Sequence, residues 1–95
     1  MKSNLKGIRI LVKGRVQKVG FRKFVFQKAI ELSVVGTVKN VGADTVEVFA
    51  KGTNMQLDEL LEWCRSGPPL SKVIRVEVHA KEEVDCKEFK VIKNN

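Results

Sequence analysis

The stretch Gly14-Arg15-Val16-Gln17-Lys18-Val19-Gly20-Phe21-Arg22 joins two segments of different periodicity. Before it, every second residue from Ile8 to Val12 is apolar, which is typical of a half-buried strand. After it, apolar residues recur at helical spacing, namely Phe21, Val25, Ala29 and Leu32, flanked by Phe24, Phe26 and Ile30. The stretch is therefore predicted to be a loop that leads from a strand into the N-terminus of a helix.

Such a loop is suited to hold an anion. The first backbone N–H groups of a helix have no partner within the helix, and the helix dipole places about half a positive charge there. Gly14 and Gly20 can adopt left-handed conformations that turn successive N–H groups inward. The loop does not fit the ATP-binding pattern Gly-x-x-x-x-Gly-Lys-Ser/Thr, because Phe21 follows Gly20.

Arg22 occupies an unusual position for a surface charge. At about 100° per residue it falls inside the apolar arc of the predicted helix, between Phe26 and Ala29. A bound oxyanion would satisfy its guanidinium through paired hydrogen bonds. Alternatively, the side chain reaches solvent or pairs with an internal carboxylate. Geometry alone favours neither interpretation.

The middle of the chain predicts a hairpin and a second helix. The segments 34–40 and 45–51 are rich in β-branched residues and are joined by Val41-Gly42-Ala43-Asp44. In the second of them Val46, Val48 and Ala50 share one face, so the opposite face should be wetter, with Phe49 as an exception that meets a neighbouring segment. Thr53-Asn54-Met55-Gln56 has the spacing of a capping box and opens an amphipathic helix with Leu57, Leu60, Leu61 and Cys64 on one face.

The end of the chain predicts two more strands. Ser66-Gly67-Pro68-Pro69 ends the second helix, the segment 73–80 alternates, and a charged connector leads to a short apolar run at 89–92. The order is strand, helix, strand, strand, helix, strand, with a short C-terminal strand. We therefore expect an α+β, ferredoxin-like sandwich, with an antiparallel sheet of four to five strands and both helices on one face.

Length and composition indicate one basic domain. The 95 residues, with 43% hydrophobic content, are enough for a single core, so we expect one domain over residues 1–95. Lys and Arg total 18 against 11 Asp and Glu, and the net charge of +7 favours acidic partners. No apolar run approaches the ~20 residues that cross a bilayer, so we expect a cytoplasmic protein without membrane association.

Conventional catalytic groups are few. The single histidine, His79, is expected at the surface, Cys64 as a packed thiol and Cys86 as an exposed one, although pairing between the cysteines stays open. No dense cluster of His, Cys or carboxylate residues predicts a metal site. Asn40 can place a water molecule if its strand lies beside the loop, but asparagine also suits turns, and the residues alone favour a turn.

Residues 14–22 resemble the signature of the acylphosphatases, Gly-x-Val-Gln-x-Val-x-Phe-Arg. Further matches follow in the family's order and extend over nearly the whole chain: Gly36-Thr37-Val38-Lys39-Asn40, Val46-Glu47-Val48 with Ala50 and Gly52, Gly67-Pro68-Pro69 with Val73, and Phe89. The chain departs from the family at Lys18, where glycine or histidine is usual, at Thr37, where an aromatic residue is common, and at Ala43-Asp44-Thr45, where an Asp-Gly turn is frequent.

The resemblance implies an acylphosphatase that needs no cofactor and no metal. By resemblance, phosphate is bound by Arg22 and by the loop residues Arg15, Val16, Gln17, Lys18, Val19 and Gly20, while Asn40 orients the attacking water. The expected partners are a small acyl phosphate and inorganic phosphate, with no nucleic acid, and the chain is expected to be a monomer. The alternative is a basic RNA-binding module on the same fold. A further rival, a carbamoyl-phosphate-handling domain of hydrogenase-maturation proteins, normally belongs to a much larger chain.

Overall fold

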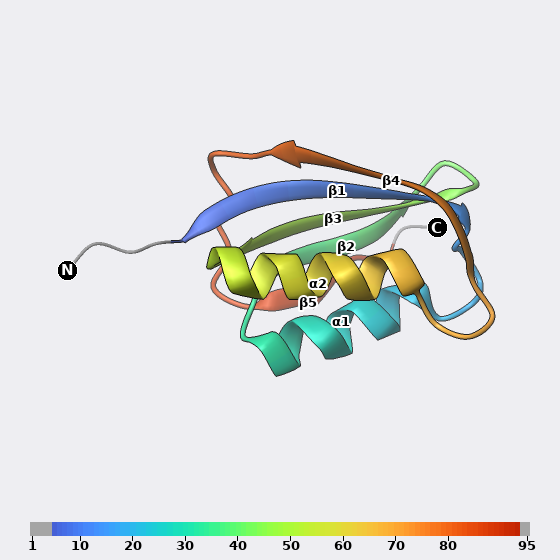
Figure 1. Cartoon of the computed structure of the whole chain (residues 1–95), viewed down its shortest axis with the longest axis horizontal. Coiled ribbons are helices and arrows are strands. Elements are labelled where there is room, and N and C mark those ends of the chain that lie inside the picture. Colours follow the sequence, from blue (N-terminus) through green and yellow to red (C-terminus); the bar gives the residue numbers. More distant parts are fainter. Residues whose placement is uncertain (1–4, 94–95) are drawn as a thin grey trace.

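The computed structural model describes residues 5–93 and contains a five-stranded sheet with two helices packed on one face (Figure 1). The elements in chain order are β1 (Lys6–Arg15), α1 (Phe21–Leu32), β2 (Val35–Val41), β3 (Thr45–Gly52), α2 (Asn54–Ser66), β4 (Lys72–Ala80) and β5 (Phe89–Val91). The predicted ferredoxin-like α+β class is confirmed. Of the single domain expected over residues 1–95, residues 1–4 and 94–95 lie outside the described part.

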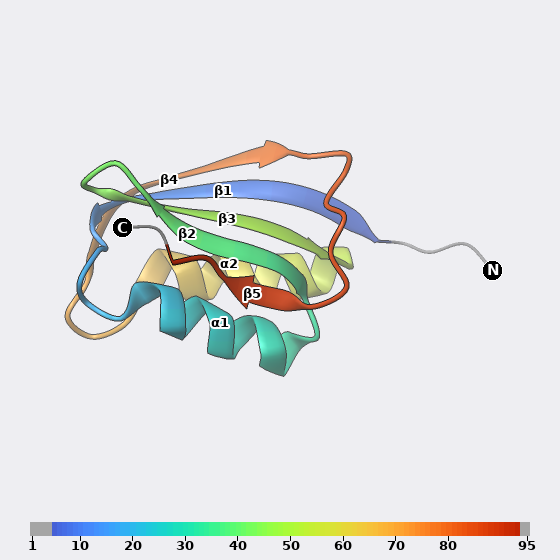
Figure 2. The ribbon, with the colours of Figure 1, turned by 180° about the vertical axis from the view of Figure 1, so that it is seen from behind.

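The strands lie in the order β4-β1-β3-β2-β5. The β4, β1, β3 and β2 strands are antiparallel, as expected, but β5 pairs parallel to β2, so the sheet is mixed. The connector between β4 and β5 crosses at one end of the sheet, from one edge strand to the other (Figure 2). Because β5 consequently runs opposite to β4, it runs in the same direction as β2.

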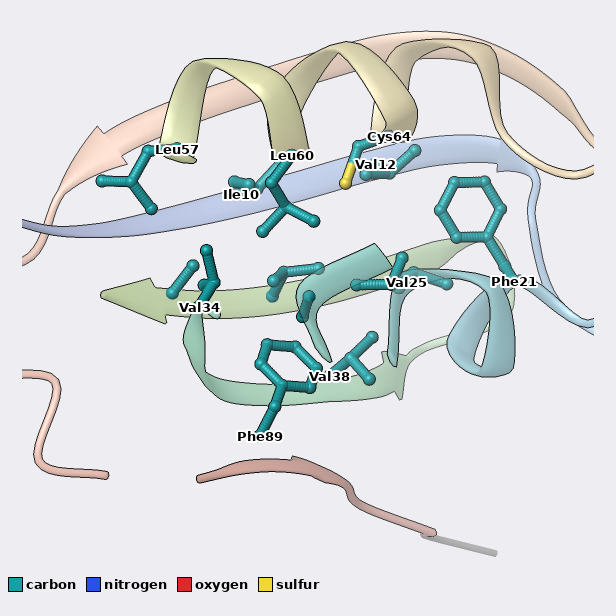
Figure 3. Close-up of a cluster of buried hydrophobic side chains, with 14 of the residues drawn as sticks. Ile10, Val12, Phe21, Val25, Val34, Val38, Leu57, Leu60, Cys64 and Phe89 are labelled. Atoms are coloured by element: carbon teal, nitrogen blue, oxygen red, sulfur yellow. The ribbon is translucent and has the colours of Figure 1, made fainter. Parts of the chain in front are cut away.

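The core fills the space between the helices and one face of the sheet (Figure 3). Ile10, Val12, Val38, Val46 and Val48 from the sheet, Phe21, Val25 and Ala29 from α1, and Leu57, Leu60 and Cys64 from α2 are all buried. The predicted periodicities of these segments are thereby confirmed. One expectation was wrong: Ile30 is 53% exposed, because the buried stripe of α1 follows an i, i+4, i+8 spacing and ends at Ala29.

The helix ends follow the sequence signals. At the start of α2, the Gln56 backbone N–H donates to Thr53 Oγ1 at 3.2 Å and the Thr53 N–H donates to Gln56 Oε1 at 2.8 Å, which completes the predicted capping box. At its end Gly67 has φ 67°, a left-handed value that favours glycine. Among residues 5–93, neither helix has the length and apolar content required to span a bilayer.

The face of the sheet away from the helices is held by ion pairs. Glu47 is only 7% exposed, although its face was expected to be the wetter one. Arg9 Nε donates to its Oε2 at 2.7 Å and Lys39 Nζ lies 3.7 Å from its Oε1, which compensates the buried carboxylate. Phe49 on the same face is half-buried, with Lys81 Nζ of the connector 5.9 Å from its ring centroid, as the expected contact with a neighbouring segment requires.

The two cysteines and the single histidine lie outside the junction between β1 and α1. Cys64 is fully buried, and burial raises the pKa of its thiol to about 12, so it stays protonated at neutral pH. Cys86 is half-buried rather than exposed, and both cysteines are free. His79 lies at the surface, as expected, with Nε2 3.5 Å from Glu77 Oε1.

Candidate active site

The junction between β1 and α1 requires unusual backbone angles. Gly14 has φ 133° at a bulge between β1 and β4, where a Cβ atom would collide with the Lys72 carbonyl. Gly20, at the N-cap of α1, has φ 80°. Lys18 also has a positive φ, 63°, in the left-handed region that disfavours residues with a side chain. The chain thereby reverses from the strand into the helix within five residues, Val16 to Gly20.

The N-terminus of α1 has no side-chain cap. Its first hydrogen bond runs from the Phe24 N–H to the Gly20 carbonyl at 3.0 Å, and Gly20 has no side chain that could accept from the amides of residues 21–23. These amides are the donors that a helix terminus offers to an anion.

Gln17 ties the loop to the β2–β3 hairpin. Its Nε2 donates to the carbonyls of Val41 (3.3 Å), Gly42 (3.1 Å) and Thr45 (2.9 Å). The Gly14 N–H adds a bond to the Asp44 carbonyl at 3.0 Å. The hairpin end that carries Asn40 is therefore fixed against the loop that precedes Arg22.

A pocket of about 340 Å³ opens where the loop, α1, β2 and the chain after β5 meet. Its lining consists of Val16, Lys18, Gly20, Phe21, Arg22, Lys23, Phe26, Asn40, Val91 and Lys93. Four of these residues are cationic and none is acidic, while Phe21, Phe26 and Val91 form an apolar wall. Low-polarity walls strengthen the interaction of such cations with an anion.

The two residues expected to carry the chemistry line this same pocket. Arg22 is half-buried, and its Nη1 donates to the Ile92 carbonyl at 3.1 Å. Within residues 5–93, no carboxylate forms an ion pair with Arg22, so the alternative of an internal carboxylate partner was wrong. Asn40 is half-buried in β2, opposite Val46. The turn interpretation of Asn40 was also wrong, because β2 continues to Val41 and the turn follows it.

The loop residues expected to bind phosphate divide into two groups. Val16, Lys18 and Gly20 line the pocket. Arg15 ends β1 with an exposed side chain, Gln17 holds the hairpin, and Val19 is half-buried, and none of these three side chains is part of the lining. The lining residues that were not predicted as site residues are Phe21, Lys23, Phe26, Val91 and Lys93. The first three follow from the helix that was predicted, whereas Val91 and Lys93 reach the pocket only through the parallel pairing of β5, which leaves no local signal in the sequence.

The fold and the pocket define a small α+β sandwich with a basic pocket at a strand–helix junction. Comparison with known proteins identifies its relatives. The acylphosphatase family model matches residues 8–91. The chain therefore belongs to the acylphosphatase family, whose members hydrolyse acyl phosphates.

Individual relatives cover nearly the whole chain. An acylphosphatase from Acaryochloris marina is 33% identical over 93 residues, covering 98% of this chain and 100% of that protein. The structure of an acylphosphatase from Coxiella burnetii superimposes with a TM-score of 0.89 at 37% identity, covering 94% of each chain. Full-length HypF, in its phosphate- and nucleotide-bound form, matches 94% of this chain with a TM-score of 0.83 at 26% identity, but only 12% of its own length is covered.

Lys18 generates a prediction that separates backbone strain from charge. Replacing Lys18 with Gly or Ala removes the same cation, but only glycine adopts φ 63° without a steric penalty. We expect Lys18→Gly to exceed Lys18→Ala in free energy of unfolding by about 1 kcal/mol, after allowance for the greater entropy of the unfolded glycine chain. Urea denaturation measures the difference. If Lys18→Ala were instead the more stable variant by about 0.4–1 kcal/mol, the difference expected from unfolded-chain entropy alone, position 18 would carry no strain.

Proposed function

We propose that the chain hydrolyses the carboxyl–phosphate bond of small acyl phosphates, releasing a carboxylate and inorganic phosphate. The observation that carries the proposal is the pocket that Arg22 and Asn40 share with the loop, lined by cations and by no acidic residue. Membership of the acylphosphatase family supports the reaction class.

In the proposed mechanism, the phosphoryl group binds at the N-terminus of α1. Backbone amides of the loop and the guanidinium of Arg22 hold its oxygens, and the helix dipole adds to the attraction. Lys18 at the tip of the loop adds positive charge to the pocket. Because these donors are fixed before the substrate arrives, they stabilise the charge that grows on the phosphoryl oxygens in the transition state.

Asn40 orients the water that attacks phosphorus. A carboxamide offers both an acceptor and donors, so it can hold a water molecule in a defined orientation without changing its own protonation state. The water oxygen forms a bond to phosphorus as the bond from phosphorus to the acyl oxygen breaks. The electron pair leaves with the carboxylate, and both protons of the water stay on the phosphate that is released as H₂PO₄⁻. The conjugate acid of this leaving group has a pKa of about 4, so no general acid is needed.

The reaction itself is the first test. We expect the purified protein to release inorganic phosphate from benzoyl phosphate in a buffer that contains no added metal, as measured by a phosphate-release assay. The RNA-binding alternative predicts a different result, namely no phosphate release together with a change in fluorescence anisotropy of a labelled single-stranded RNA. That result would reverse the assignment.

Substitutions of Arg22 and Asn40 are expected to affect phosphate affinity and turnover differently. Arg22→Ala should weaken the binding of inorganic phosphate and also lower turnover, whereas Asn40→Ala should leave phosphate affinity unchanged and lower turnover only. Each variant should reduce the rate by about 10²–10³, the usual effect of removing one preorganised group that stabilises a transition state. Phosphate affinity is measured by calorimetry and turnover by phosphate release.

Arg65→Ala and Asn54→Ala serve as matched controls, because both side chains are exposed on α2 and neither lines the pocket. Both control variants should keep the full rate. An equal loss of phosphate affinity in Arg22→Ala and Asn40→Ala would contradict the separate roles.

A further inference from the structure

The segment that follows β5 is part of the pocket although it lies at the opposite end of the sequence from the loop. It passes between β2 and the first turns of α1 (Figure 2), and its Lys93 lines the pocket together with Val91, the last residue of β5. Between them, the Ile92 carbonyl accepts a hydrogen bond from Arg22 Nη1 at 3.1 Å. This is a contact between residues that are 70 positions apart.

The Ile92 carbonyl is a fixed acceptor. The Ile92 N–H donates to the Val38 carbonyl at 2.8 Å, which extends the pairing of β5 with β2 by one residue. Upstream, Phe89 is 4% exposed and its ring lies 6.4 Å from that of Phe26, measured between centroids. The Ile92 side chain is 39% exposed. The position of this residue therefore depends on its main chain and on the anchoring of β5, and only weakly on its own side chain.

The chemistry of the contact leaves Arg22 able to bind an anion. A guanidinium carries five N–H donors on three nitrogens, and the bond to Ile92 engages Nη1. The edge formed by Nε and Nη2 makes no other hydrogen bond or ion pair within residues 5–93, and such an edge matches two oxygens of a phosphate. A neutral carbonyl orients the guanidinium without neutralising it, whereas a carboxylate in the same place would compete with the anion.

We propose that Ile92 is a positioning residue, whose main-chain carbonyl holds the Arg22 guanidinium so that its Nε–Nη2 edge faces the phosphoryl group. This inference rests on the proposed function for the identity of the anion. The segment after β5 thereby becomes part of the active site. Ile92 acts on the phosphate through Arg22 and does not contact the phosphate itself.

The test compares two substitutions at Ile92. Ile92→Pro removes the N–H that joins the segment to Val38 and should displace the carbonyl, whereas Ile92→Ala keeps the main chain and is the matched control. We expect Ile92→Pro to lower kcat/KM for benzoyl phosphate and the affinity for inorganic phosphate by about 10- to 100-fold, because small displacements of positioned groups have effects of this size. Ile92→Ala should stay within about twofold of the unsubstituted protein.

A double-mutant cycle shows whether Ile92 acts through Arg22. In an Arg22→Ala background, Ile92→Pro should cause no further loss, because the group it positions is already absent. The same loss in both backgrounds would overturn the proposal, since it would mean that Ile92→Pro damages the pocket independently of Arg22. Full activity of Ile92→Pro would overturn it as well.

Two further measurements do not depend on the proline variant or on turnover. Arg22→Lys keeps the charge, but a single ammonium cannot stay on Ile92 and also present a two-donor edge, so its phosphate affinity should fall nearly as far as that of Arg22→Ala. Near-normal affinity of Arg22→Lys would contradict the inference.

In ¹⁵N spectra, the Arg22 Nη groups should show slowed rotation, and free rotation in the unsubstituted protein would contradict the contact even if hydrolysis is observed. Absence of hydrolysis with slowed rotation would instead reject the proposed function alone.

Discussion

The hydrogen bonds from Gln17 Nε2 to the carbonyls of Val41, Gly42 and Thr45 join the two halves of the pocket. The loop before α1 leads to Arg22 in the first turn of the helix, whereas Asn40 lies near the end of β2. The pocket therefore needs a contact that holds these two parts of the chain together. Because the amide group of Gln17 bridges loop and hairpin, the N-terminus of α1 opens toward the strand that carries Asn40. The left-handed backbone at Lys18 and Gly20 makes this arrangement possible, since it lets the chain turn from β1 into α1 within a few residues.

The electrostatic character of the pocket follows from which charges are paired elsewhere. On the open face of the sheet, Arg9 and Lys39 surround the buried Glu47, and Lys13 and Arg75 surround Glu77, where Lys13 has the largest part in lowering the pKa of that carboxyl. At the pocket, the lining contains cations without carboxylates, and Arg22 is oriented by a neutral carbonyl. Positive charge is therefore compensated on the open face and left available at the pocket. A phosphate monoanion or dianion is the kind of ligand that such a site favours.

Much of the fold could be predicted because the apolar patterns are local. The i, i+4, i+8 stripe of α1, the capping box of α2 and the alternation in β1 and β3 each specify one element and its buried face. The direction of β5 was not predictable in this way, since its three residues carry no pattern that distinguishes parallel from antiparallel pairing. Ile30 shows a related limit: an apolar residue beside a stripe is buried only if a neighbouring element covers it.

The candidate site was predictable where it is contiguous, and otherwise only in part. The glycine positions and the helix N-terminus indicated an anion site at residues 14–22 from physical reasoning alone, whereas the placement of Arg22 within an apolar arc left its partner open. Asn40 required the resemblance, because residue type alone favoured a turn, and the structure places it in a strand. The contact of Arg22 with Ile92 and the presence of Lys93 in the lining depend on the long-range packing of β5, so no local sequence pattern predicts them.

The most direct test of this account is a titration of the ¹⁵N-labelled protein with inorganic phosphate, followed by two-dimensional NMR. The account predicts the largest shift changes at the backbone amides of residues 16–22, at the Arg22 guanidinium and at the Asn40 carboxamide, all saturating with one affinity. Shift changes that are centred on the open face of the sheet, or that leave the N-terminus of α1 unaffected, would contradict it.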